Sequence, residues 1–162
     1  MKMTRLALTL IVLFGCAKVE HEHDPALVGT WEPYYLTLED ANADPDSGAP
    51  MHDVFMATPT NWEKVTGIKP IRITYASDGT FTREHRDRND SLFLRSSGTW
   101  YTDGDSLYWS QDRPDTSRFT LRYSIVQDTL RTSGIVDFDR DGLVNDRMIE
   151  FQKRIVEANS TK

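Results

Sequence analysis

The feature that most constrains this chain is a series of short segments in which apolar and polar residues alternate. In RFTLRYSI every second residue from Phe119 to Ile125 is apolar, and the residues between them are Arg, Thr or Ser. A repeat of two is typical of a β-strand with one buried face. Asp-Gly pairs at 78–79, 103–104 and 141–142 separate such segments and indicate tight hairpin turns.

About eight segments are predicted to form strands, the first being GTWEPYYLTL and the others lying between residues 70 and 156. In the last of them Ile149, Phe151 and Ile155 are predicted to share a face. Strands joined mostly by tight turns favour an antiparallel barrel or sandwich. Because successive hairpins favour an up-and-down order, we predict an all-β, up-and-down barrel of about eight strands, with a β-sandwich as the alternative. Closure of the barrel would remove exposed strand edges.

Residues 39–66 interrupt the alternation. Their first half, EDANADPDSGAP, is acidic and rich in Pro and Gly, which predicts a loop. Their second half is predicted to form one or two short helical turns with an apolar patch of Val54, Phe55, Met56 and Trp62. A connection this long in a compact domain is usually functional or disordered.

Residues 1–15 have the features of an export signal. Lys2 and Arg5 precede Leu6–Phe14, nine residues that are all apolar except Thr9. A helix needs about 20 residues to cross a bilayer core, so this run is too short and fits the apolar region of a secretory signal instead.

Cys16, the single cysteine of the chain, follows this signal directly. The run Leu13-Phe14-Gly15-Cys16 resembles the lipobox of bacterial lipoproteins. This resemblance implies that Cys16 is acylated, begins the mature chain and anchors it in a lipid bilayer, where two or three acyl chains give durable attachment. A plain secreted protein with a stray cysteine is the alternative.

Residues 16–26 are predicted to be a solvated, lipidated tether, because AKVEHEHDPA is polar and charged. His21, His23 and Asp24 are candidate metal ligands, but we favour the solvated tether because no other ligand lies nearby. Ala17 resembles the sorting signal for the outer membrane. The predicted location is therefore the bacterial cell envelope, lipid-anchored, in the outer membrane.

The mature chain is acidic. Removing residues 1–15 removes two of the 19 basic residues and none of the 25 acidic ones, so the net charge changes from −6 to −8. This charge argues against binding to nucleic acid. We predict one domain at residues 27–156, a tail at 157–162, and a monomer.

Several motifs resemble those of a known family. LVGTWEPYYL resembles the Gly-x-Trp opening of the lipocalin and calycin barrels, and SDGTFT and SSGTWYTDGDSLYW resemble later strands of lipocalin-like domains on bacterial lipoproteins. The resemblance implies that Trp31 closes one end of the barrel beneath a basic residue of the last strand, either Lys153 or Arg154. Guanidinium groups stack well on indole, which favours Arg154. It also implies that residues 39–66 cover the open end as a lid. Alternatively, Trp31 and Trp100 are ordinary core aromatics of another β-sandwich.

The resemblance further implies a small apolar or amphipathic ligand inside the barrel. The candidate ligand-lining residues are Tyr75, Phe81, Trp100, Trp109, Phe119, Leu121 and Tyr123. The same side chains could instead fill the barrel. The predicted function is thus ligand binding by a membrane-anchored lipocalin-like lipoprotein, and the alternative is a non-catalytic interaction or scaffold module with a solid barrel.

The acidic run DFDRDGLVNDRM matches the first half of a calcium loop through Asp137, Asp139, Asp141 and Gly142. The match fails at position twelve, where a carboxylate is required and the residue is methionine. We predict at most a weak calcium site that also uses Asp146, and the alternative is a solvated hairpin loop. No other cofactor is predicted.

No catalytic constellation is visible in the sequence. His85 lies at a charged strand end, His52 has no evident partner, and the serines lack a Gly-x-Ser-x-Gly motif. We therefore predict that the protein is not an enzyme.

Overall fold

The computed structural model describes residues 21–39, 54–137 and 142–156. These residues form nine strands and one short helix: β1 (Gly29–Glu39), β2 (Val54–Ala57), α1 (Trp62–Thr66), β3 (Arg72–Tyr75), β4 (Thr80–Arg86), β5 (Leu92–Asp103), β6 (Ser106–Arg113), β7 (Ser117–Val126), β8 (Thr129–Val136) and β9 (Asp146–Ile155). None of the helical structure in this described part is long and apolar enough to cross a membrane.

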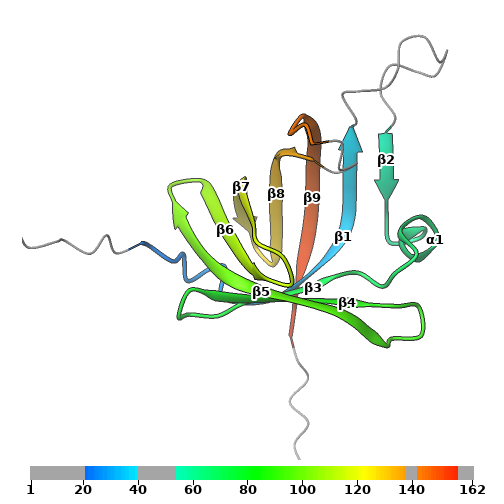
Figure 1. Ribbon diagram of the computed structural model, residues 1–162, viewed down its shortest axis with the longest axis horizontal. Coiled ribbons are helices and arrows are strands. Elements are labelled where there is room, and N and C mark those ends of the chain that lie inside the picture. Colours follow the sequence, from blue (N-terminus) through cyan, green and yellow to red (C-terminus); the bar gives the residue numbers. More distant parts are fainter. Residues whose placement is uncertain (1–20, 40–53, 138–141, 157–162) are drawn as a thin grey trace, which may run out of the picture.

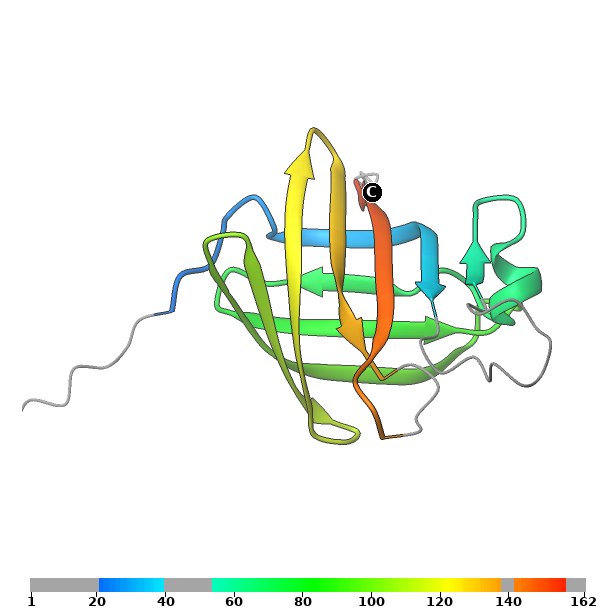
Figure 2. The same cartoon turned by 90° about the horizontal axis from the view of Figure 1, so that it is seen from above.

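The strands form one closed antiparallel sheet. Its order is β2-β1-β3-β4-β5-β6-β7-β8-β9, and β1 also pairs with β9. Strands β1 and β3–β9 therefore make an eight-strand up-and-down barrel (Figures 1 and 2). The predicted barrel is confirmed, and the sandwich alternative is wrong. The architecture is consistent with that of lipocalin-like barrels.

The inner face of the barrel carries the apolar residues that the alternation predicted. Leu121 and Leu107 pair across β7 and β6, as do Phe119 and Trp109. The main core consists of Leu27, Trp31, Ile73, Tyr75, Phe81, Trp100, Leu107, Trp109 and Leu130. Full burial of one such side chain contributes about 1.5–3 kcal/mol, so this core accounts for much of the stability of the fold.

Strand β9 presents its apolar residues to the outside. Gln152 pairs with the buried Leu130, and Arg154 pairs with the buried Trp31. Directly opposed residues in an antiparallel sheet lie on the same face, so the even-numbered residues of β9 point inward. Ile149, Phe151 and Ile155 do share a face, but it is the outer one. The reason is that both neighbouring strands set the register of β9, and its own composition does not.

One end of the barrel, which we name the closed end, is sealed by Trp31 and Arg154. The Cζ atom of Arg154 lies 4.2 Å from the centroid of the Trp31 ring. Arg154 also donates hydrogen bonds to the carbonyl oxygens of Val28 and Ala26. The indole Nε1 of Trp31 donates to the carbonyl of Leu27 at 2.7 Å. Arg154 thus occupies the place that the lipocalin resemblance assigned to a basic residue, and Lys153 does not.

Residues 21–26 are packed on this closed end, whereas the sequence predicted a solvated tether. The His21 ring stacks on Tyr101 with centroids 4.0 Å apart, and the backbone N–H of Thr102 donates to the carbonyl of Glu22. A Cβ atom at position 79 would lie only 2.3 Å from Nε2 of the His23 imidazole, so any larger residue at this position would clash with His23. Gly79 has a φ of 80°, so glycine serves both the hairpin turn and this close contact.

The described part of the long connection differs from the sequence prediction. Residues Val54–Ala57 form strand β2, which pairs with Leu36–Glu39 of β1, and only Trp62–Thr66 is helical. β2 therefore extends the sheet beside β1 (Figure 1). Phe55 packs against the cluster of Leu38, Leu121 and Val136, so this segment contacts the barrel at the end opposite the closed end.

We expect Arg154→Ala to lower the free energy of unfolding by about 2–3 kcal/mol, because it removes a cation–π contact and two charge-assisted hydrogen bonds to backbone carbonyls. Urea unfolding followed by tryptophan fluorescence measures this change. The matched control is Lys153→Ala on the outer face of the same strand, for which we expect at most about 0.5 kcal/mol. Equal losses in the two variants would contradict this account of the closed end.

Candidate ligand site inside the barrel

The seven predicted ligand-lining residues lie on the inward-facing positions of their strands, and most of them pack on one another. Trp109 contacts Phe81, Tyr75 and Phe119 with ring centroids 5.4, 5.9 and 6.4 Å apart. Trp100 meets Tyr75 edge to face at 5.2 Å. Leu121 belongs to the second cluster, and the hydroxyl of Tyr123 donates to Asp24 at 2.9 Å. The aromatic side chains therefore fill the part of the barrel next to the closed end.

Two cavities border this region without being lined by those aromatics. One of about 400 Å³ lies between β7 and β8, and one of about 330 Å³ lies beside α1. Of the seven predicted residues, Leu121 alone borders either of these two cavities.

A polar layer lies inside the barrel beyond the aromatic residues. The inward positions of β4 continue from Phe81 to Arg83 and His85, and the inward positions of β9 include Glu150 and Gln152. This layer was not among the sites predicted from the sequence. In β4 the period-two pattern indicates that Arg83 faces inward, because it follows Phe81 by two residues. In β9 the pattern does not say which face is inside, because that depends on the register with the neighbouring strands.

Glu150 and Arg83 are the charged groups of the layer. Glu150 Oε2 accepts hydrogen bonds from Gln152 Nε2 at 2.6 Å and Thr132 Oγ1 at 3.5 Å. The guanidinium of Arg83 lies over the ring of Trp109, 5.5 Å from its centroid. The two charges attract each other, but no direct ion pair between them is present in the described part of the chain.

Three buried polar atoms around these charges have no hydrogen-bond partner among the described residues. They are Arg83 Nε, Ser96 Oγ and Gln152 Oε1. The Tyr75 hydroxyl and the Trp109 indole N–H lie close enough to interact with each other. Leaving such an atom unsatisfied costs about 1–3 kcal/mol, and nearly all buried polar groups in folded proteins are hydrogen-bonded. Donors and acceptors thus converge on one region without satisfying one another, as expected for a site that binds a polar group.

Burial shifts the pKa values of the ionisable side chains in this polar layer. It raises the pKa of Glu150 and lowers that of Arg83, in each case because the charged form loses hydration. It raises the pKa of Tyr75 well above its ordinary value of 10.0, so this hydroxyl stays protonated. Burial, with the nearby charge of Arg83, lowers the pKa of His85 to about 4. At neutral pH His85 is therefore uncharged.

Glu150 keeps part of its surface accessible, and its carboxylate can accept further hydrogen bonds besides those from Gln152 and Thr132. A small polar group here could donate to Glu150 and accept from Arg83 and Tyr75.

The other candidate sites lie only partly within the described residues or against the barrel. Asp139 and Asp141 lie outside the described residues, so the calcium loop stays a prediction. Asp137 Oδ2 accepts from the backbone N–H of Gly142 at 3.2 Å, and Asp146 is buried at the start of β9. No cluster of three potential metal ligands occurs in residues 21–39, 54–137 and 142–156. His21, His23 and Asp24 each contact the barrel instead.

No protein-family model matches this chain, and no curated protein sequence matches it significantly.

We expect His85 to make stability depend on pH between about 6.5 and 4. The pKa of His85 is lower in the folded protein than in the unfolded chain. The contribution of neutral His85 to the free energy of unfolding is therefore complete above pH 6.5 and is lost as the pH falls through 4. Because His85 is partly exposed, we expect a loss of about 1–2 kcal/mol rather than that of the full shift. Urea unfolding at several pH values measures it.

In the same measurement, His85→Phe should have a smaller slope across this window, and above pH 7 the two proteins should have parallel profiles. Identical pH dependence in the two proteins would show that His85 does not titrate in this way.

Proposed function

We propose that this protein is a lipid-anchored, lipocalin-like envelope protein whose barrel binds a small amphipathic ligand. The polar end of the ligand contacts Arg83 and Glu150, and its apolar part contacts the neighbouring aromatic side chains. The observation that carries the proposal is the polar layer, where buried donors and acceptors converge without partners among the described residues.

The polar layer is difficult to explain as a device for stability. A buried charged group is usually paired, and an apolar side chain of similar volume is often as stable or more so. Here Arg83 and Glu150 each lose hydration, and neither gains a direct ion pair within the described structure. Residues that reduce stability in this way are commonly kept for binding.

The anchor and the location rest on the sequence. The Leu13-Phe14-Gly15-Cys16 run supports acylation of Cys16, and Ala17 supports the outer membrane. The contacts of residues 21–26 with the closed end add a geometric consequence. Because five residue steps separate Cys16 from His21, the distance between their Cα atoms is at most about 18 Å. If Cys16 is acylated, the closed end therefore lies near the bilayer and the opposite end lies farther from it.

A second candidate function is a non-catalytic interaction module with a solid barrel. The observation that favours it is the mutual packing of Trp100, Trp109, Tyr75 and Phe81 next to the closed end. Under this alternative, the outer surface would contact another envelope component and the polar layer would hold only water.

Native mass spectrometry of the mature protein, purified gently from its own envelope, distinguishes the two functions. We expect a small molecule to accompany the wild-type protein and to be lost from Glu150→Gln and Arg83→Met. The free energy of unfolding of the double variant Arg83→Met/Glu150→Gln, measured in parallel at pH 7.5, should be equal to or about 1 kcal/mol above that of wild type, because both buried charges are removed together.

The matched control for that experiment is Arg95→Gln on the outer face of β5, which should retain the ligand. A wild-type protein without any bound molecule would favour the solid module. Large destabilisation of the double variant Arg83→Met/Glu150→Gln would assign Arg83 and Glu150 to folding instead.

Metabolic labelling with an alkyne fatty acid tests the anchor. We expect label on the wild-type protein and complete loss of label in Cys16→Ser, because the thioether requires the sulfur atom. The membrane fraction should lose the variant as well. Label that persists in Cys16→Ser would overturn the lipoprotein assignment without affecting the interior site.

A further inference from the structure

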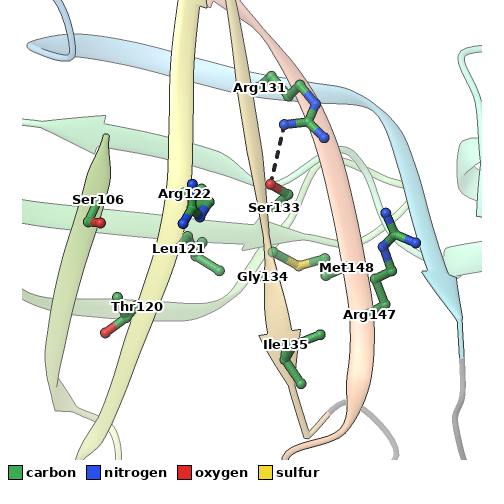
Figure 3. Close-up of a pocket in the computed structure, with 10 residues that line it drawn as sticks. All are labelled: Ser106, Thr120, Leu121, Arg122, Arg131, Ser133, Gly134, Ile135, Arg147 and Met148. Atoms are coloured by element: carbon green, nitrogen blue, oxygen red, sulfur yellow. Dashed lines mark hydrogen bonds between the residues drawn. The ribbon is translucent and has the colours of Figure 1, made fainter. Parts of the chain in front are cut away.

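The barrel wall opens between β7 and β8. The pairing of β7 with β8 ends at Arg122–Ser133. Residues 117–121 of β7 and 134–136 of β8 belong to their strands but are not paired with each other. Beyond this pair the yellow β7 and the orange β8 separate (Figure 2). Each keeps its other neighbour, β6 or β9. The result is a groove with a volume of about 400 Å³ (Figure 3).

Gly134 sets the geometry where the strands separate. A Cβ at this position would lie 2.6 Å from Leu121 Cδ2 and 3.3 Å from the carbonyl oxygen of Thr120. The absence of a side chain therefore lets β7 and β8 approach closely at the head of the groove. It also lets Leu121 and Met148 line the groove.

Three arginines line this groove, and each comes from a different strand: Arg122 of β7, Arg131 of β8 and Arg147 of β9. The guanidinium of Arg147 lies on the side of β9 that faces β1, so Arg122 and Arg131 are the cations nearest the gap between β7 and β8 (Figure 3). In a chain with a net charge of −6, such a group of cations around one depression makes a local positive potential that attracts anions.

The carboxylates paired with these cations lie outside the groove. Arg122 Nη1 is 2.9 Å from Asp105 Oδ2, and Arg147 Nη1 is 3.8 Å from Glu39 Oε2. Neither carboxylate lines the groove. Both pairs are exposed, and such pairs contribute about 0–1 kcal/mol, so an anion can compete for these cations. Arg131 donates to Ser133 Oγ at 3.3 Å.

The remaining lining combines hydroxyl groups with an apolar surface. Ser106, Thr120 and Ser133 supply hydroxyls, which can donate to an anionic oxygen. Ile135, which is 52% exposed, and Met148 supply the apolar part. A fully hydrated inorganic anion would leave this apolar surface unused.

We propose that the groove between β7 and β8 binds a small amphipathic anion. Its phosphate, sulfate or carboxylate head contacts Arg122 and Arg131, since guanidinium groups form strong paired hydrogen bonds with such oxygens. Its apolar part lies on Ile135 and Met148. The groove is separate from the interior site, because neither Arg83 nor Glu150 lines it.

Isothermal titration of the full chain carrying Cys16→Ser tests this site with octyl phosphate as the probe. We expect the double variant Arg122→Gln/Arg131→Gln to bind octyl phosphate at least about tenfold more weakly, because it loses two charge-assisted contacts. Arg95→Gln on the outer face of β5 should bind as the wild type does.

Two further probes separate the parts of the ligand. Inorganic phosphate and octyl glucoside should both bind much more weakly than octyl phosphate. Equal binding of octyl phosphate to the double variant and to wild type, or binding of either control probe as tightly, would overturn the proposal. Loss of binding in Glu150→Gln alone would also overturn it, by assigning the amphiphile to the interior site.

Vesicles of phosphatidylglycerol and of phosphatidylcholine then identify the source of the anion. Cosedimentation with phosphatidylglycerol that is lost in the double variant would identify a membrane phospholipid. Binding of octyl phosphate without cosedimentation would identify a free amphiphile. Either result supports the groove as a site for amphipathic anions, whereas cosedimentation equal in the two proteins would contradict it.

Discussion

The pairing of β1 with β9 is the constraint on which the rest of this structure depends. It joins the first and last strands of the barrel along most of their length, from Thr30–Ile155 to Glu39–Arg147, and so leaves the eight barrel strands without a free edge. The same pairing places Arg154 over Trp31 at 4.2 Å, which seals one end. Closure and the seal are thus two results of one register.

This closure has a consequence for the interior. Because β9 is paired on both sides, its even-numbered residues face inward and bring Glu150 and Gln152 into the barrel. Arg83 reaches the same region from β4. The polar layer is therefore built from strands far apart in the sequence, and burial disfavours both charges. The groove between β7 and β8 has a different origin. The pairing of β7 with β8 stops there, while β7 remains paired with β6 and β8 remains paired with β9. One sheet thus offers an inner and an outer place for polar groups of ligands.

The closed end also shows how much a short segment can gain from a finished barrel. Residues 21–26 are polar, and by themselves they cannot bury enough surface to order. On the barrel, His21 meets Tyr101, His23 meets Trp100, and Asp24 accepts from Tyr123. The contacts exist because the turn between β5 and β6 meets β7 at this end, where the backbone N–H of Tyr123 donates to the carbonyl of Asp105.

The amino-acid sequence by itself determined the local structure. Alternation and Asp-Gly turns predicted the barrel strands, and the Trp31 motif with the chemistry of guanidinium predicted the role of Arg154. Period-two patterns and turn residues act over a few residues, so they can be read without a fold. Tertiary structure alone decided which face of β9 lies inside, that Val54–Ala57 is a strand, and where the candidate sites lie. Each of these depends on partners distant in the chain, whose register follows from closure of the whole sheet.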